Sequence, residues 1–480
     1  MNFKLRPYSA YKNSGVPWLG KVPKHWEVRK LRGILRRVTE RNRPDLPLLS
    51  VVRERGVIRR DITNEAENHN YIPDDLTNYK VVQVGQFAMN KMKAWQGSYG
   101  VSQFKGIVSP AYYVFNLSGV DGRFFHSAIR SRAYVPSFTQ ASDGVRTGQW
   151  DLAEARMREI GFAIPSLSEQ TAIVRFLDHY DRKIRRYIRA KQKLIKLLEE
   201  QKQAIIHRAV TRGLDPNVRL KPSGVDWLGD IPEHWEVRRL KEVTTPIEQG
   251  WSPQCDAWSA AEHEWGVLKV GCVNGDKFDE GQNKKLPSTL TPIPELEVQD
   301  GDILVSRANT RELLGLATLV VNPRQRLMLC DKLFRFRVKS KRIDPQFLVY
   351  AIRQKTSRAQ IESSTNGASD SMQNIGQDVV RNLWLSLPSL DEQRKILVRL
   401  EVQTSAIVTT IAQAHQEISL LREYRTRLIA DVVTGKLDVR EAAANLPEDA
   451  EKDNISEEFE EPIEEREEAI DSELETSLGD

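Results

Sequence analysis

The sequence is poor in cysteine and has no long apolar run. Its 480 residues include three cysteines, Cys255, Cys272 and Cys330, all in the second half of the chain. An odd and sparse set of this kind does not build a disulfide framework, which indicates a reducing compartment. No stretch reaches the ~20 apolar residues that a membrane-spanning helix needs. We therefore expect a cytoplasmic protein with no membrane segment.

Motifs of catalysis are missing as well. There is no Gly-x-x-x-x-Gly-Lys-Ser/Thr loop of an ATPase motor, no Asn-Pro-Pro-aromatic or Asp-Pro-Pro-aromatic tetrapeptide of an amino-methyltransferase, and no glycine-rich signature for S-adenosylmethionine. Asp300 and Asp302 lack the separated Glu-x-Lys of a nuclease. His263 does not stand at zinc-ligand spacing from Cys255 or Cys272. The sequence therefore predicts a non-catalytic recognition protein without a cofactor or metal of its own.

The charge is divided unevenly along the chain. Residues 447–480 hold 16 Asp or Glu against two basic residues, a net charge of −14, so that 69 Lys and Arg against 50 Asp and Glu leave +19 on residues 1–446. A basic body favours a polyanionic partner, and double-stranded DNA is the usual one. A basic surface that only keeps the protein soluble is the alternative. We expect the acidic segment to be disordered, either as a solubilising tail or as a mask over the basic surface.

The chain contains an internal repeat of domain size. Residues Ser14–Leu31 return as Ser223–Leu240, with 13 of 18 positions identical at an offset of 209. A period of about 200 residues is far too long for a solenoid unit, which takes roughly 20–50 residues. The repeat therefore predicts two whole domains of one kind in a single polypeptide.

Two further matches show which part of the repeat keeps its length. Ile164–Gln170 matches Leu387–Gln393 at an offset of 223, and Val82–Gly85 resembles Val298–Gly301 at an offset of 216. The offset grows within the first part of each unit and then stays constant. Each unit is therefore a globular part of variable length followed by a part of fixed length. Variable length suits a recognition surface, and fixed length suits a packed seam.

The fixed part predicts a long helix in each unit. Residues 168–211 contain neither glycine nor proline, and Arg212-Gly213 follows as a stop signal. Apolar residues recur every seven positions, which favours two helices buried against each other in an antiparallel coiled coil of about 60 Å, at ~1.5 Å per residue. A stripe packed on a globular core is the alternative. The predicted seam residues are Leu177, Ile184, Ile188, Ile195, Leu198, Ile205, Leu400, Ile407, Ile411, Ile418, Leu421 and Leu428.

The globular parts combine short predicted strands with turn-rich segments. The fold class is therefore α+β, with two α/β domains separated by the two antiparallel helices and a pseudo-two-fold internal repeat. The predicted divisions of the chain are residues 1–167 and 213–390 for the domains, 168–212 and 391–436 for the helices, and 447–480 for the acidic tail.

The repeated tryptophan motif predicts packing. His25 and His234 precede Trp26 and Trp235, without a nucleophile or carboxylate at a telling spacing. We interpret the motif as docking the start of each domain onto the helix of the preceding unit. In a circular arrangement the first motif then lies near the second helix.

Together these features resemble the specificity (S) subunit of a Type I restriction–modification system. The resemblance covers residues from about 10 to 440 and rests on the twin Trp-Leu-Gly openings, the Leu-Pro-x-Leu-x-Glu-Gln helix entries and the paired helices. It implies two target-recognition domains that each read half of a bipartite asymmetric DNA site, and helices that set the spacer and dock two modification subunits. Restriction/translocase subunits complete such a complex. S-adenosylmethionine, ATP and Mg are then expected on those partners. The acidic tail departs from the pattern.

Candidate DNA contacts follow from side-chain chemistry. Arg or Lys suits guanine, and Asn or Gln suits adenine. The candidates in the first domain are Lys91, Lys93, Gln96, Tyr99, Arg146 and Gln149, and those in the second are Arg307, Asn309, Arg311, Asn366, Ser369 and Gln373. For each of them, a solvated surface residue is the alternative. For the whole chain the alternative is a helical scaffold that gathers partner proteins and has only non-specific DNA affinity.

Overall fold

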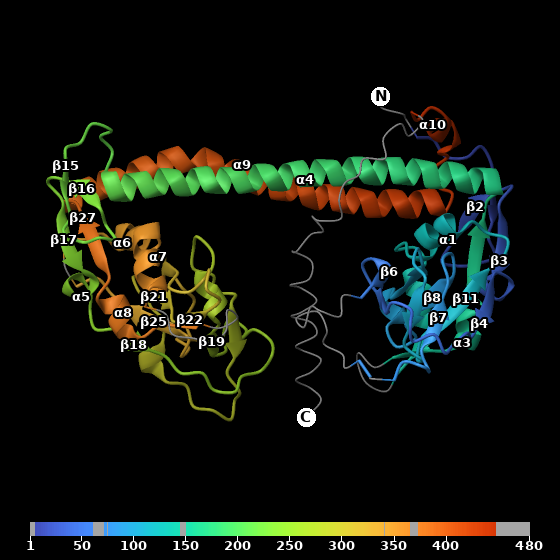
Figure 1. The fold of residues 1–480 in the computed structure, drawn as a ribbon, viewed down its shortest axis with the longest axis horizontal. Coiled ribbons are helices and arrows are strands. Elements are labelled where there is room, and N and C mark those ends of the chain that lie inside the picture. The colour runs from blue at the N-terminus through green and yellow to red at the C-terminus, as the bar shows by residue number, and fades with distance from the viewer. Residues whose placement is uncertain are drawn as a thin grey trace. The chain divides into compact units, whose positions relative to one another are not determined.

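Two long helices, α4 (Leu167–Arg212) and α9 (Leu390–Val433), dominate the computed structural model (Figure 1). The chain forms two units, one from residues 1–192 and 415–480 and one from residues 193–414, so that each unit contains part of both helices. The structure describes residues 5–60, 72–73, 75–144, 150–339, 341–364 and 373–447. The predicted acidic tail lies almost wholly outside these ranges.

An antiparallel four-stranded sheet forms the centre of the first unit. Its order is β4 (Leu35–Val38), β11 (Tyr113–Leu117), β8 (Phe87–Met89) and β9 (Tyr99–Val101). All three residues of β8 are buried, as expected of a central strand rich in large apolar side chains.

The second unit repeats this sheet. Its order is β18 (Glu248–Gln249), β25 (Leu333–Phe336), β21 (Ile303–Ser306) and β23 (Ala317–Leu319). Strand β21 follows β8 at an offset of 216, the offset of the weak match found in the sequence. The two units therefore share one topology, which confirms the predicted mixed α+β fold.

Shorter elements surround both sheets. The first unit has β1 (Tyr11–Asn13), β2 (Lys21–Pro23), β3 (Glu27–Lys30), η1 (Leu31–Gly33), β5 (Leu49–Val52), β6 (Gly56–Arg59), β7 (Lys80–Val82), η2 (Ala94–Gln96), β10 (Gly106–Val108), α1 (Gly122–Ile129), α2 (Val135–Gln140), β12 (Ser142–Asp143), β13 (Asp151–Leu152), α3 (Glu154–Met157), β14 (Gly161–Ile164) and α10 (Arg440–Ala444). The second has β15 (Leu220–Pro222), β16 (Asp230–Pro232), β17 (Glu236–Arg239), α5 (Leu240–Val243), β19 (Gly266–Leu268), η3 (Val270–Val273), β20 (Asn283–Lys285), η4 (Pro294–Leu296), β22 (Ala308–Asn309), β24 (Leu327–Met328), α6 (Pro345–Ile352), α7 (Lys355–Glu362), β26 (Gln373–Asn374), α8 (Gln377–Arg381) and β27 (Trp384–Leu387).

The helices run antiparallel in the first unit. Asp181 pairs with Arg425, and Lys191 Nζ lies 2.6 Å from Glu417 Oε2. Residue numbers that rise along α4 are therefore paired with residue numbers that fall along α9. Of the predicted seam residues eight are buried and four, Leu198, Ile205, Ile411 and Leu421, are half-buried. None of the twelve is exposed, as burial of an apolar seam requires.

The ends of the helices belong to the domain cores. Leu428, Val432 and Val433 of α9 join the aromatic core of the first unit, which includes Trp26 and Phe162. In the same way the last turns of α4 enter the core of the second unit. Each globular part therefore rests on the start of one helix and on the end of the other.

Candidate nucleic-acid interface

The first turn of each long helix holds the tryptophan motif by a carboxylate, which is buried in the first unit and half-buried in the second. Glu169 Oε1 accepts a hydrogen bond from Trp26 Nε1 at 3.0 Å, and its Oε2 lies 2.8 Å from His25 Nε2. In the second unit Glu392 holds Trp235 and the histidine before it at 3.1 and 2.9 Å. Because a buried tryptophan N–H needs an acceptor, the glutamate fixes the motif on the helix.

The glutamine that follows each glutamate fixes a second helix of the domain. Gln170 Nε2 donates to the Pro165 carbonyl at 2.9 Å, and its Oε1 accepts from the backbone N–H of Asp121, the N-cap of α1, at 2.7 Å. Gln393 does the same for the N-cap of α6, Asp344, at 2.8 Å. The repeated Glu-Gln pair therefore sets the orientation of each globular part on its helix start.

Each motif also meets the end of the other helix. Trp26 shares a core with Leu428 and Val432 of α9, and Trp235 shares one with Ala209 of α4. This agrees with the predicted docking on the helix of the preceding unit, closed into a circle. The sequence did not predict the contact of each motif with the first turn of its own helix.

The predicted DNA contacts start at the same place in both units. Lys91 and Arg307 follow the equivalent strands β8 and β21, at the offset of 216 that relates these strands. The Lys91 carbonyl accepts a hydrogen bond from the Leu152 N–H at 3.1 Å, and the Arg307 carbonyl accepts one from the Ile375 N–H at 3.0 Å. Leu152 and Ile375 are related by the later offset of 223. The same backbone hydrogen bond therefore joins equivalent residues in both units.

In the first unit the candidates differ in their exposure. Lys91 Nζ lies 2.9 Å from Asp151 Oδ2, so this lysine already has a partner. Lys93 is exposed and Gln96 is half-buried. Tyr99 is fully buried, and its hydroxyl donates to the Ile129 carbonyl at 3.3 Å. Its predicted role is therefore corrected to packing, because a ring inside the core cannot reach DNA.

In the second unit two candidates lie opposite each other. Asn309 of β22 pairs with Gln373 of β26 in an antiparallel ladder, so both side chains leave the same face. Arg307 Nη1 donates to the Asp331 carbonyl at 3.3 Å, and Arg311 is exposed. The candidates in the two flanking loops, Arg146, Gln149, Asn366 and Ser369, lie outside the described residues.

The structure adds two residues that the sequence did not single out. Trp95 and Trp150 form a ring pair with centroids 5.5 Å apart and planes inclined by 44°. Trp150 is related to Gln373 by the offset of 223, so it occupies the equivalent place in the first unit. That offset was the signal in the sequence that could have found it.

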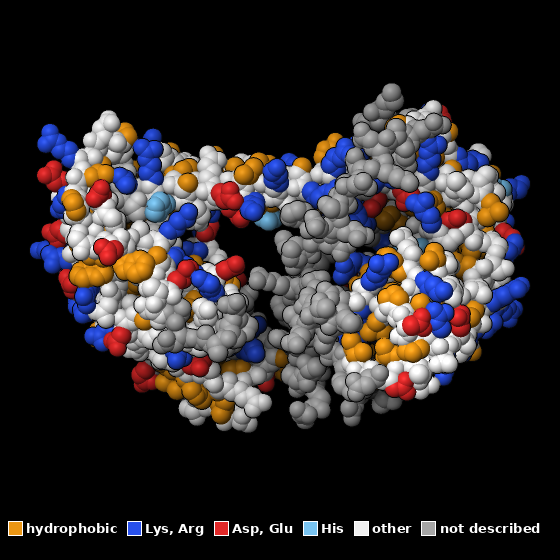
Figure 2. All heavy atoms as spheres, in the orientation of Figure 1, with side chains coloured by type: hydrophobic (Ala, Val, Ile, Leu, Met, Phe, Trp, Pro, Cys, Tyr) orange, Lys and Arg blue, Asp and Glu red, His pale blue; other side chains and the backbone are white. Residues whose placement is uncertain are grey.

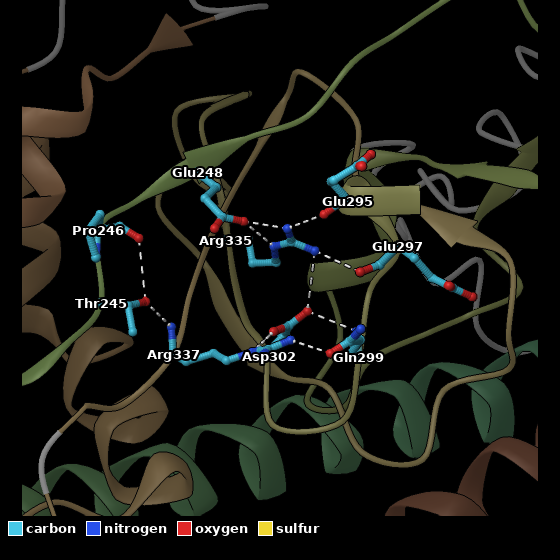
Figure 3. Close-up of polar contacts among 9 residues, drawn as sticks. All are labelled: Thr245, Pro246, Glu248, Glu295, Glu297, Gln299, Asp302, Arg335 and Arg337. Atoms are coloured by element: carbon cyan, nitrogen blue, oxygen red, sulfur yellow. Dashed lines mark hydrogen bonds and ion pairs between the residues drawn. The ribbon is translucent and has the colours of Figure 1, made fainter. Parts of the chain in front are cut away.

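A buried charge network supports the interface in the second unit (Figure 3). Asp302 is fully buried at the start of β21 and accepts hydrogen bonds from Arg337 Nε at 2.5 Å and from the Gln299 N–H at 2.9 Å. Arg335 lies between Asp302 and Glu248. Asp302 raises the pKa of Arg337. Asp302 and Arg335 each have an oppositely charged partner in this network, which links the start of β21 to β25.

In the first unit the position equivalent to Asp302 holds an uncharged residue. Gln86 stands where Asp302 does, at an offset of 216, and its Nε2 donates to Asn116 Oδ1 at 2.8 Å. The scaffold is therefore shared while the polar groups that stabilise it differ.

One face of α4 carries a row of basic residues. Arg182, Arg185, Arg189, Lys193 and Lys196 are spaced by three or four positions, which places them on one side of the helix. The equivalent residues of α9 are neutral: Ser405, Val408, Ala412, Gln416 and Ser419. Lys and Arg side chains are also visible along the helices in Figure 2.

In each unit α4 makes a polar contact with the globular part of that unit. Asp178, one turn before the row, pairs with Arg123 of α1, and His207 Nδ1 lies 2.9 Å from Gln354 Oε1. Within the first unit, the face of α4 that carries the first residues of the row is therefore the face that meets the globular part of that unit.

The described residues contain neither a metal-ligand group nor a membrane-spanning helix. No group of three or more His, Cys, Asp or Glu side chains in these ranges could hold a metal ion. Within the same ranges, none of the helices has the length and apolar character to span a bilayer. Burial raises the pKa of Cys330 to about 12 and also raises that of Cys272, so both thiols stay protonated.

The two repeats match a family of DNA specificity proteins. The family described as Type I restriction modification DNA specificity domain matches residues 23–197 and 232–420, which is more than half of the chain. The chain belongs to this family. Its two matches coincide with the two repeats, and the specificity subunits are non-catalytic, so the prediction that the chain is not an enzyme is confirmed.

Individual relatives are similar over different lengths. The EcoEI specificity subunit of Escherichia coli is 32% identical over 210 residues, which cover 43% of this chain and 35% of that subunit. The MjaVIII specificity subunit of Methanocaldococcus jannaschii is 26% identical over 360 residues, 72% of this chain and 78% of that one. A chain of a solved type I restriction–modification system has a TM-score of 0.58 at 16% identity, with coverage of 87% and 99%, and shows the fold alone.

Proposed function

We propose that each globular part reads one half of a bipartite, asymmetric DNA site on behalf of a type I restriction–modification complex. The observation that carries the proposal is the twin interface after β8 and β21. One scaffold presents Lys93, Trp95 and Trp150 in the first unit, and Asn309 and Gln373 in the second. Because base edges are recognised by the pattern of donors and acceptors, different side chains at one position predict different half-sites.

The two helices act as the spacer between the half-sites. Helix α4 has 46 residues and therefore a length of ~69 Å at ~1.5 Å per residue, close to two turns of B-DNA at about 34–36 Å each. A length fixed by continuous helix tolerates no insertion without shifting the register of the reading domains.

The helices also dock two modification subunits, and the restriction/translocase subunits complete the assembly. In the first unit Tyr187, Leu420 and Tyr424 are exposed on α4 and α9. Exposed aromatic and aliphatic side chains of this kind suit a protein partner, because their burial is favourable. Adenine methylation with S-adenosylmethionine and the ATP- and Mg-dependent steps belong to those partners.

Adenine methylation mapped in a reconstituted complex tests the function. The wild-type chain is combined with its modification subunits, and the methylated motif is compared with that of Asn309→Ala. We expect the variant to relax one half of the motif and to leave the other half unchanged, since Asn309 belongs to one unit only. Lys21→Ala, at an exposed lysine on β2, serves as the control.

Two outcomes of this test contradict the proposal. A motif that changes in both halves means that the units do not read separately. A wild-type chain that binds random and methylation-mapped duplexes equally well supports instead the helical scaffold with non-specific DNA affinity.

A further inference from the structure

We infer that Trp95 in the first unit and Gln373 in the second determine specificity, each through one polar atom that a base edge completes. The inference rests on the proposed function and names the atoms that carry it. Trp95 Nε1 is a donor and Gln373 Oε1 is an acceptor, so the two half-sites must offer opposite groups at these positions.

Both atoms are buried and lack a protein partner. Among the described residues five buried side-chain polar atoms have no hydrogen bond, and Trp95 Nε1 and Gln373 Oε1 are two of them. A buried polar group without a partner costs free energy in the folded state, so each instance needs an explanation. Completion by a ligand is such an explanation.

The two atoms lie beside the same repeated position, although Trp95 and Gln373 are not themselves equivalent residues. Trp95 belongs to the segment that begins at Lys91, and its ring contacts Trp150. Gln373 is the counterpart of Trp150 and pairs with Asn309, which follows Arg307 as Lys93 follows Lys91. An unpartnered polar atom therefore lies at this position in the second unit and in contact with it in the first, which points to a common use of the position.

The neighbouring candidates are already engaged. Asn309 Nδ2 donates to Asn274 Oδ1 at 3.2 Å, and its Oδ1 accepts from the Thr310 N–H at 2.9 Å. Lys91 is paired with Asp151. A base contact by either residue would first break these interactions, whereas a base contact by Trp95 Nε1 or Gln373 Oε1 breaks no hydrogen bond and requires only that the side chain turn to expose its buried atom.

The chemistry of each atom predicts the base that it reads. A glutamine whose Oε1 accepts from N6 and whose Nε2 donates to N7 is the bidentate pair for adenine. An indole N–H can only donate, and the acceptors in the major groove are guanine O6 and N7, adenine N7 and thymine O4. The half-site of the second unit therefore contains an adenine, and that of the first unit contains a base that presents an acceptor.

Two variants test the inference, and each removes the unpartnered polar atom together with the group that bears it. Trp95→Phe removes the N–H and keeps an aromatic ring, and Gln373→Met removes the amide at nearly the same length. The full chain is titrated with the methylation-mapped duplex and with duplexes that carry one substitution in either half. We expect each variant to bind the mapped duplex about tenfold more weakly and to lose discrimination at one base of one half-site. Trp258→Phe and Gln416→Met, at exposed residues, are the controls.

Thermal unfolding separates recognition from structure. Because each variant removes an unpartnered buried atom, the free protein should keep or gain thermal stability while recognition falls. The ratio of affinities for two duplexes is independent of the folded fraction, so it remains decisive even if a variant unfolds more easily. Unchanged discrimination at every base overturns the inference. A wild-type chain that does not discriminate at all refutes the proposed function instead.

Discussion

Arg425 and Lys202 occupy equivalent positions of the two repeats, at the offset of 223, yet they find different partners. Arg425 of α9 pairs across the seam with Asp181 of α4. In the second unit Thr404 stands where Asp181 does, and Lys202 pairs with Asp276 of the globular part. A polar position inside an apolar seam fixes register, and here the second unit uses it to hold its domain to the helix.

Loss of this contact should loosen the second unit. Asp276→Asn leaves the Lys202 ammonium, which is 10% exposed, without its carboxylate. We expect a loss of about 1 kcal/mol in the free energy of unfolding, less than for a fully buried pair because Asp276 is itself largely exposed. Urea unfolding measures the change. Asp226→Asn, at an exposed aspartate of the same unit, should have no effect. Equal stability of both variants would show that the pair does not clamp the domain.

Glu169, the carboxylate that holds the first tryptophan motif, should contribute more to the free energy of unfolding than the Lys202–Asp276 pair. Glu169 is 3% exposed and holds Trp26, His25 and the Tyr8 hydroxyl, the last at 2.6 Å. Glu169→Gln keeps one acceptor oxygen and loses the charge, so we expect a cost of about 1–3 kcal/mol. Differential scanning calorimetry should place this loss in the first unit. Glu159→Gln, which removes only exposed ion pairs, should cost less than about 1 kcal/mol. Similar losses for the two variants would contradict the assignment.

The lowered pKa of His126 predicts how the stability of the first unit depends on pH. Burial and the nearby Arg130 lower the pKa of His126 to about 4, and its Nδ1 accepts from the Val101 N–H at 3.1 Å. An unfolded histidine titrates near ~6.5, so between about pH 6.5 and 4 the unfolded chain binds the extra proton. The stability that the neutral ring contributes is complete above ~6.5 and falls as the pH drops toward 4.

A variant without a titratable ring isolates this contribution. His126→Asn keeps an acceptor, and its stability should vary less between pH 7 and pH 4.5 than that of the wild type, by up to about 3 kcal/mol. Urea titrations at several pH values measure the difference. Parallel curves for the two proteins would remove His126 as the cause.

The architecture followed from the sequence because its signals are local or repeated. The offset of 223 between Gln170 and Gln393, together with the heptads, predicted two like domains and two long helices. The pairing inside the sheets could not be predicted in this way, because β4 and β11 lie far apart in the chain and each has only a few residues. Partner choice among short strands depends on tertiary packing, which periodicity does not record.

The candidate site residues stay predictions, and the structure shows where their side chains lie. Lys91 and Arg307 were chosen for their chemistry, and the structure brings them to one repeated position. The prediction that Tyr99 contacts DNA was wrong, because the aromatic ring of a tyrosine can be buried in a core as well as lie at a surface. Trp95 was missed because its neighbour Trp150 is distant in sequence, and the two segments come together only through tertiary contacts, among them the Leu152–Lys91 hydrogen bond and the Lys91–Asp151 ion pair.

The basic row on α4 predicts a sequence-independent part of DNA binding. Arg189, Lys193 and Lys196 have no side-chain partner in the described ranges and lie on one face of α4. If they contact phosphates, Arg189→Gln, Lys193→Gln and Lys196→Gln together should flatten the slope of log K against log salt by about 2.7, at ~0.9 per contact. Affinity should fall by the same factor for the methylation-mapped duplex and for random DNA, since phosphates carry no sequence information.

A second triple variant separates this effect from net charge. Lys183→Gln, Arg208→Gln and Arg399→Gln remove the same three charges from exposed positions on other faces of the helices. Fluorescence anisotropy over a range of salt concentrations should give this variant a slope near that of the wild type, because charges that face away from the DNA release few counterions. Equal slopes for the two triple variants would mean that only the overall charge matters and that the row on α4 does not touch DNA.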